Sequence, residues 1–191
     1  MRTTDYNGYT NHATWYTASH IVLDEGTGWV ESLIEDLFHN GLAFDIVTRA
    51  YEMREEMGVR SWRIEDEAVA TFAKYFRSWF EGVCLSQGDS ITATFARFYA
   101  EDIDWHQIAA HVWDYDDVHT AISFACDAYA ISKIDGVESL ISATQKDFRD
   151  WGWDELKVAI EELRAHGYVC ATEAVKYPNT FELEDIKFVK S

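Results

Sequence analysis

Apolar residues recur at helical spacing along most of the chain. The clearest stripe follows the spacing i, i+3, i+4, i+7 and i+8 and consists of Val30, Leu33, Ile34, Leu37 and Phe38. This spacing places all of its members on one face of a helix. Thr27 is the candidate N-cap, and Asn40 with Gly41 would end the helix.

Five further stretches show the same pattern. Their apolar positions are Ile46, Ala50, Met53 and Met57; Val69, Phe72, Phe76, Trp79, Phe80 and Val83; Ile91, Phe95, Phe98 and Tyr99; Trp105, Ile108, Ala109 and Val112; and Val118, Ile122, Ala125 and Tyr129. We expect each set to line the buried face of one helix. Gly58 would end the first of these helices, and Asp104 and Asp117 are candidate N-caps of the last two.

The character of the sequence changes after Asp135 and Gly136. Two shorter stripes predict two more helices, formed by Val137, Leu140, Ile141 and Phe148 and by Leu156, Ile160 and Leu163. The second would end at His166, with Gly167 as a left-handed C-cap.

The final segment, YVCATEAVKYPNTFELEDIKFVK, is rich in β-branched and aromatic residues and predicts a β-hairpin. Tyr177-Pro178-Asn179-Thr180 would form its turn, because proline suits the second position of a tight turn. Phe181 and Leu183 differ in parity from Ile186 and Phe188. A bulge near Glu184 and Asp185 would therefore be needed to keep all four inward.

These patterns predict a mainly α fold: a compact multi-helix bundle with a C-terminal helix-helix-β-hairpin appendage that resembles a winged helix. We expect an acidic helical domain at 1–136 and a small α+β module at 137–191, which could also pack on the first as one unit. A DNA-binding role for the module is disfavoured. It holds 11 acidic and 7 basic residues, and its second helix has no basic stripe.

Composition supports a folded globule with a strongly negative surface. Of the 191 residues, 48% are hydrophobic and 15% aromatic, which is too apolar for a disordered chain. The 34 acidic and 16 basic residues give a formal charge of -18. Because nucleic acids and anionic membranes are bound largely through Lys and Arg, we expect contact with neither. The expected partner is a protein with a basic surface.

The cysteines indicate a reducing compartment. Cys84, Cys126 and Cys170 are odd in number and widely separated, which favours neither a disulfide framework nor a zinc site. We expect Cys84 to be a buried structural thiol. The sequence has no charged leader followed by an apolar core and no run of 18 apolar residues, so the expectation is a soluble, cytoplasmic protein.

No motif of catalysis, metal binding or cofactor binding is evident. The best metal candidates, His106 and His111 with Asp114, are poorly placed, because positions five apart on a helix lie about 140° round the axis. His119 could join them only through a favourable turn. The segment at 26–28 is too short for a phosphate-binding loop. We expect His12 and His20 to be capping or packing residues, and we expect no metal and no cofactor.

Clustered acids are the feature most suggestive of function. The clusters are Glu52, Glu55 and Glu56; Glu65, Asp66 and Glu67; Glu101, Asp102 and Asp104; and Asp114, Asp116 and Asp117. One interpretation is a solvated surface. The other is mimicry of nucleic acid in the basic groove of a partner, which requires acids from several helices to converge on one face.

The residues that we predict to bind a partner combine acids with neighbouring aromatic residues. They are Asp114, Asp116, Asp117, Glu101, Asp102, Trp113 and Tyr115. Aromatic side chains are frequent anchors of protein interfaces. Core packing would explain Trp113 equally well.

The opening stretch YNGYTNHATW predicts a turn followed by a helix start. Asn7 and Gly8 suit a turn in which glycine takes a positive φ, and Thr10 or Asn11 can cap the helix. Tyr9 would pack against a downstream apolar residue. We interpret the stretch as a structural lock for the N-terminal segment rather than a binding site.

The same residues carry a resemblance. Tyr6-Asn7-Gly8-Tyr9-Thr10-Asn11 followed by Thr14-Trp15 resembles the start of a family of small uncharacterised proteins found mostly in tailed bacteriophages, and DIDWHQIAAH (Asp102–His111) is similar to a later segment of that family. Many members have Glu where Ala13 stands, so the capping box with Thr10 is incomplete here. The resemblance implies a phage accessory protein in the infected bacterium's cytoplasm, and it brings no catalytic residues.

Origin and charge together predict a protein that binds a host protein and inhibits a nucleic-acid-targeting defence, such as restriction or CRISPR, as an acidic DNA mimic. Two alternatives stay open. One is a small enzyme with an unrecognised active site, which would show a pocket with converging polar side chains and a shifted titration. The other is a structural or regulatory oligomer, suggested by the surplus of aromatic residues.

Overall fold

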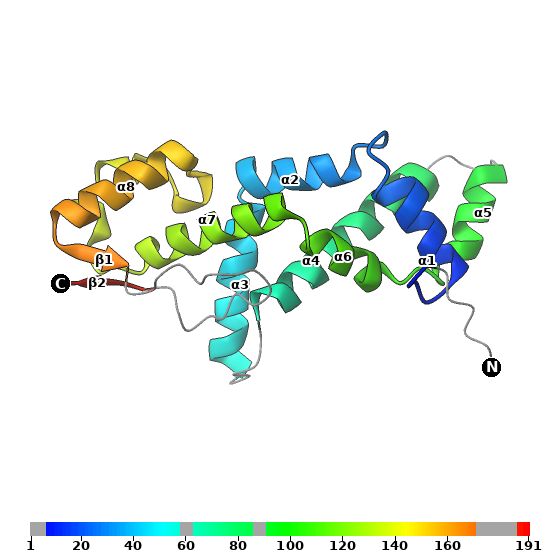
Figure 1. Ribbon diagram of the computed structural model, residues 1–191, viewed down its shortest axis with the longest axis horizontal. Coiled ribbons are helices and arrows are strands. Elements are labelled where there is room, and N and C mark those ends of the chain that lie inside the picture. Colours follow the sequence, from blue (N-terminus) through cyan, green and yellow to red (C-terminus); the bar gives the residue numbers. More distant parts are fainter. Residues whose placement is uncertain (1–6, 58–62, 86–90, 171–186) are drawn as a thin grey trace. The chain divides into compact units, whose positions relative to one another are not determined.

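The computed structural model describes residues 7–57, 63–85, 91–170 and 187–191 (Figure 1). Eight α-helices account for most of this part of the chain: α1 (His12–Thr17), α2 (Trp29–His39), α3 (Leu42–Met57), α4 (Ile64–Phe80), α5 (Ile91–Ala100), α6 (Trp105–Trp113), α7 (Asp116–Ser132) and α8 (Trp153–Ala165). π-Helical turns follow α1 at Ala18–Val22 and α4 at Glu81–Leu85. The prediction of a mainly helical bundle is confirmed.

The C-terminal hairpin is also confirmed. Strand β1 (Tyr168–Cys170) pairs antiparallel with β2 (Phe188–Lys190), and Val169 lies opposite Val189. Gly167 has a φ of 82°, so it is the left-handed residue predicted after α8. The predicted turn at 177–180 and the predicted bulge near 184–185 lie outside the described residues.

The chain divides into two compact units. Unit 1 comprises residues 1–33 and 68–114, and unit 2 comprises 34–67 and 115–191. The domain boundary that we predicted at 136/137 falls inside unit 2, where α8 packs against α7.

Unit 1 has an aromatic core. Phe72 and Phe76 of α4 are fully buried, and so are Ile108 and Val112 of α6. These positions belong to the predicted apolar stripes and are buried as predicted, whereas Val83, the last position of the stripe in 69–83, is 52% exposed. The rings of Phe80 and Trp105, which also belong to the stripes, lie 5.4 Å apart.

The opening stretch is fastened to the start of α6 by hydrogen bonds. The Gln107 side chain bonds both ways: its Nε2 donates to the Gly8 carbonyl at 2.9 Å, and its Oε1 accepts from the Thr10 amide at 2.9 Å. Asn11 Nδ2 donates to the Asp102 carbonyl at 2.7 Å. We call residues 8–14 and 102–107 with these bonds the N-terminal joint.

The joint also connects two helix caps. Asn11 Oδ1 accepts from the Thr14 amide at 2.8 Å and caps α1, and Asp104 Oδ1 accepts from the Gln107 amide at 3.1 Å and caps α6. The buried Thr14 hydroxyl donates to Asn11 Oδ1 at 3.1 Å and accepts from the Asp104 amide at 2.9 Å. One hydroxyl thus serves both helix starts, which confirms the structural lock.

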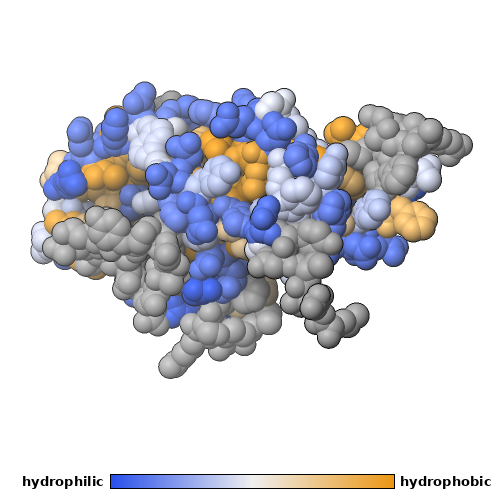
Figure 2. All heavy atoms as spheres, turned by 45° about the vertical axis from the view of Figure 1, so that its right-hand side comes forward, coloured by the Kyte–Doolittle hydropathy of each residue, from blue (hydrophilic) through white to orange (hydrophobic). Residues whose placement is uncertain are grey.

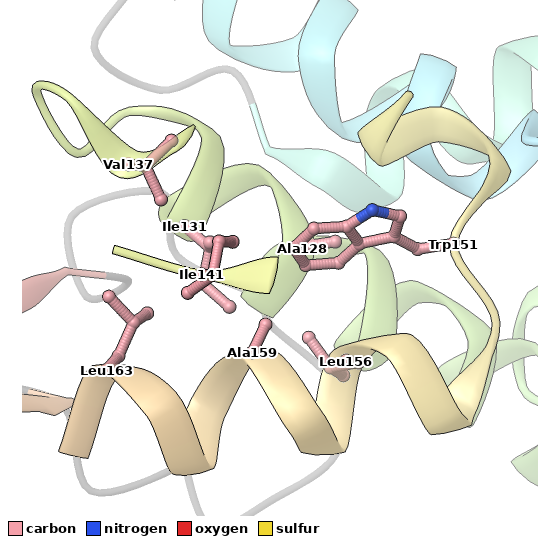
Figure 3. Close-up of a cluster of buried hydrophobic side chains, with 8 residues drawn as sticks. All are labelled: Ala128, Ile131, Val137, Ile141, Trp151, Leu156, Ala159 and Leu163. Carbon is pink, nitrogen blue, oxygen red and sulfur yellow. The ribbon is translucent and has the colours of Figure 1, made fainter. Parts of the chain in front are cut away.

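Unit 2 contains an apolar cluster, which we call the α7–α8 core (Figure 3). Its members are Ala128 and Ile131 of α7, Leu156, Ala159 and Leu163 of α8, and Val137, Ile141 and Trp151 of the segment between the helices. In Figure 3 the Trp151 ring extends into the cluster beside Ala128. Elsewhere in unit 2, α3 packs on α7, and the rings of Tyr51 and Tyr129 stack with their centroids 4.5 Å apart.

The predicted helix through 137–148 is wrong. The structure has 3₁₀ turns at Val137–Ser139, Ser142–Gln145 and Phe148–Asp150 instead. Ile141 is extended, with φ -129° and ψ 139°, and the next amide, that of Ser142, donates to Glu162 Oε2 on α8 at 2.6 Å. Tertiary packing onto the α7–α8 core and this bond override the local periodicity.

Two predicted caps are also wrong. The Thr27 hydroxyl donates to the carbonyls of Ile21 and Asp24, and Gly28, with φ 71°, precedes α2. Asp117 lies within the first turn of α7, whose N-cap is Tyr115. An N-cap residue has non-helical backbone immediately before the helix, and residue type alone did not locate that position.

Candidate functional site

The predicted partner-binding acids of unit 1 are exposed but lie apart. Glu101 and Asp102 precede α6, and Asp114 follows it. Nine helical residues span about 14 Å, so the two groups flank opposite ends of α6. Asp102 contributes its main-chain carbonyl to the N-terminal joint, which leaves its exposed carboxylate available.

Unit 2 contains three more of the predicted residues. Asp116 and Asp117 are exposed in the first turn of α7, and Tyr115 is 38% exposed. Carboxylates in a first turn are stabilised by the helix dipole, so these two also have a structural role. Tyr115 beside two carboxylates is an accessible aromatic residue in an acidic setting.

Trp113 belongs to the core. It is 2% exposed, which excludes its ring from contact with a partner in this conformation. The packing alternative that the sequence left open for this residue is the one observed.

Helix starts account for another acidic cluster. Glu65, Asp66 and Glu67 all lie in the first turn of α4. Glu67 is only 4% exposed, and its Oε1 lies 3.1 Å from Nε of Arg49 on α3. Runs of acids in the sequence therefore mark helix N-termini as well as surface, since negative side chains are favoured there.

Three histidines of unit 1 pack against aromatic rings. His12 and His20 contact Trp15 and Tyr16, with centroid distances from 4.9 to 6.2 Å, and the His111 ring lies 5.1 Å from that of Tyr9. Packing is one of the two roles, capping or packing, that we predicted for His12 and His20. Among the described residues, no group of three His, Cys, Asp or Glu side chains is arranged to hold a metal ion.

Unit 1 has a recess with charged walls. Its volume is about 520 Å³, and it is lined by Arg77, Phe80, Glu81, Arg97, Ala100, Glu101, Ile103 and Trp105. Arg77 Nε donates to Glu81 Oε1 at 2.8 Å. Glu101, one of the predicted partner-binding residues, thus lines this recess together with Glu81.

Unit 2 has a smaller recess, which we call the aromatic recess. Its volume is about 320 Å³, and Phe38, His39, Phe124, Gly152 and Trp153 line it. The ring of Trp153 lies 4.7 Å from that of Phe124, in an edge-on arrangement, and 6.4 Å from that of Phe38. The Trp153 side chain remains 45% exposed.

Two neighbouring groups on α7 have raised pKa values. Burial raises the pKa of Asp127 to about 6. Burial, together with the negative charge of Asp127, raises the pKa of the Cys126 thiol well above its ordinary value. Cys126 is therefore a protonated packing residue rather than a nucleophile. The side chain of Cys84 lies outside the description.

Two carboxyl groups of α8, which bond residues of the preceding turns, have lowered pKa values. A hydrogen bond from Lys146 lowers the pKa of Glu155, and the Ser142 hydroxyl lowers that of Glu162. Both groups stay ionised at neutral pH.

Comparison with known proteins gives no assignment. No protein-family model matches the chain, and no curated protein or solved structure shows significant similarity to it. Within the residues that the structure describes, every helix is too short or too polar to cross a membrane.

Sequence reasoning missed Gln107 and Trp153. The partners of Gln107 are main-chain atoms 97 and 99 residues away, and nothing in the sequence signals them. The sequence did contain a signal for Trp153, because this residue lies one helical turn before Leu156 and so continues the apolar stripe of α8. Its exposure shows that the stripe extends beyond the α7–α8 core.

Proposed function

We propose that this protein is a phage accessory protein that binds a host protein through acidic surface, acting in the bacterial cytoplasm. The proposed target is a protein with a basic, nucleic-acid-binding groove, and the proposed role is an acidic DNA-mimic-type inhibitor of restriction or CRISPR. The observation that carries the proposal is a formal charge of -18 with exposed carboxylates at Glu101, Asp102, Asp114, Asp116 and Asp117.

The electrostatic argument is general. A large net charge of one sign steers a partner of opposite sign and accelerates association. Figure 2 shows one face on which hydrophilic side chains predominate, with apolar atoms exposed between them. Protein interfaces combine such a polar rim with a few apolar anchors. The resemblance of the opening motif to phage proteins supports the proposed setting.

Charge reversal tests the proposal. Two variants carry Lys at Glu101 and Asp102 or at Asp114, Asp116 and Asp117, and each is compared with wild type in affinity capture from bacterial lysate. We expect at least one variant to lose the captured protein by about tenfold or more, and wild-type capture to weaken at high salt because exposed charges are screened. Circular dichroism confirms that the variants are folded.

A matched control variant distinguishes the loss of a defined binding site from the effect of the change in net charge. Glu52, Glu55 and Glu56 are exposed on α3, and their replacement by Lys changes the charge as much as the triple variant does. We expect this control to retain most of the binding. Equal loss in the control and the test variants would indicate attraction without a defined site, and unchanged binding in both test variants would reject these acids as the interface.

The charged recess of unit 1 favours a second candidate, a small enzyme. Arg77, Glu81, Arg97 and Glu101 line it together with the rings of Phe80 and Trp105. A thermal-shift screen of small metabolites tests this function. A compound whose stabilisation is lost in Arg97→Gln would support it, and a screen without such a compound would leave the binding protein as the better proposal.

A further inference from the structure

The aromatic recess of unit 2 has a property that the α7–α8 core lacks. Trp151, in that core, is 2% exposed, whereas Trp153, two residues later, is 45% exposed. The Trp153 indole is nevertheless fixed on two sides, by Phe124 of α7 and Phe38 of α2. A large ring that is both exposed and held in place costs little entropy to use in binding.

The size and chemistry of the recess fit one long side chain. Its volume of about 320 Å³ is walled by three aromatic rings, by His39 and by the backbone at Gly152. The faces of aromatic rings carry partial negative charge and attract cations, most strongly at tryptophan.

Charge selects among the possible occupants. The chain carries a net charge of -18. On α8 the exposed Asp154 directly follows Trp153 and the exposed Lys157 lies one turn further on, so the sign of the field is taken from the net charge of the chain. This field disfavours an anion and adds attraction for a cation. An apolar side chain would contact the same rings but would gain nothing from the field. Arginine suits the recess better than lysine, because its planar guanidinium stacks on a ring while keeping its N–H donors free for carboxylates.

We propose that the aromatic recess binds an arginine side chain of a basic partner protein, with the guanidinium stacked on Trp153. This inference rests on the proposed function, which supplies the premise that the partner is a protein with a basic surface. The recess shares no residue with the acidic groups whose reversal tests that function, so each can fail without the other.

Nuclear magnetic resonance titration of the whole purified protein tests the recess directly. The probes are N-acetyl-arginine methylamide, its citrulline counterpart, which has nearly the same shape without the charge, and the leucine counterpart. Binding is followed at the Trp153 indole N–H and the Gly152 amide, and the Trp153 resonance is assigned by its loss in Trp153→Phe. We expect saturable shifts with arginine and about fivefold or greater weakening with citrulline.

Two variants complete the test. Trp153→Leu keeps an apolar wall but removes the indole face, and the Gly152 amide should no longer shift with arginine. Tyr16→Leu removes another exposed aromatic side chain, in unit 1, and should leave the titration unchanged. Equal binding of arginine and leucine would identify an apolar occupant and overturn the proposal. Absence of a saturable arginine shift in the wild-type protein would also overturn it.

Discussion

The N-terminal joint of unit 1 and the α7–α8 core of unit 2 both hold distant segments of the chain together, but through different interactions. Each fixes segments that are separated in the sequence. The joint uses directional hydrogen bonds among Gly8, Asn11, Thr14, Asp104 and Gln107, whereas the core uses apolar side chains without directional partners. Hydrogen bonds confer specificity at modest net energy, and apolar burial supplies most of the stability. Substitutions in the two regions should therefore differ in size and in kind.

The largest loss of stability is expected on substitution of Trp151. Truncation by Trp151→Ala leaves a cavity in the α7–α8 core and should lower the free energy of unfolding by about 3–5 kcal/mol. Urea unfolding followed by circular dichroism measures it. Trp153→Ala is the control, since its exposed ring contributes less burial. Equal losses at the two tryptophans would show that the core does not depend on Trp151.

A smaller loss is expected at Thr14. Thr14→Val keeps the shape but removes the hydroxyl that serves both caps, and should cost about 1–3 kcal/mol. Hydrogen exchange should accelerate at the Asp104 amide, which loses its acceptor. In the control Thr120→Val, the lost hydroxyl is exposed and bonds only a carbonyl of its own helix. A loss at Thr14 no greater than in the control would contradict the coupling of the two caps.

Substitution of Asp127 should change the free energy of unfolding least, and it should raise it rather than lower it. Its pKa rises to about 6 on folding because of burial, so the folded state binds the proton more tightly than the unfolded state does. This raised pKa makes stability fall as pH rises from about 4 to 6. At neutral pH the buried charge is unfavourable, and Asp127→Asn should stabilise the protein by about 1–2 kcal/mol.

The pH dependence isolates this group. The difference in unfolding free energy between Asp127→Asn and wild type should shrink as pH falls from 7 towards 4, because the wild-type carboxyl becomes neutral. The same exchange at the exposed Asp135 is the control for removing one carboxylate that is not buried. A constant difference at Asp127 would mean that its carboxyl titrates normally.

The same contrast explains what the sequence could predict. Helices such as α4, α6 and α7 follow from apolar periodicity, because burial depends on which face a residue occupies and hardly on its partner. The caps Asn11 and Asp104 follow from residue type. The predictions of Thr27 and Asp117 as N-caps were wrong, because the backbone conformation determines which residue lies immediately before the helix, and several polar residues are near each start. The helix predicted through 137–148 failed because Ile141 is extended where its neighbour bonds Glu162.

The candidate site was less accessible from the sequence than the fold. The exposure of Asp114, Asp116 and Asp117 could be anticipated, but Trp113 entered the core. The aromatic recess depends on three rings from three helices, at 38, 124 and 153, and no local pattern indicates that they meet. Interactions between distant segments are what a single sequence shows least well.

The N-terminal joint imposes an order on biosynthesis. Its long-range bonds connect residues 90, 91, 97 and 99 positions apart. During translation, the segment at 8–14 must wait for the segment at 102–107 to leave the ribosome before its polar groups find their partners. Contacts of such long sequence separation form late and slow folding. A nascent chain arrested before residue 102 would thus expose an unfinished α1, a natural target for chaperones and proteases.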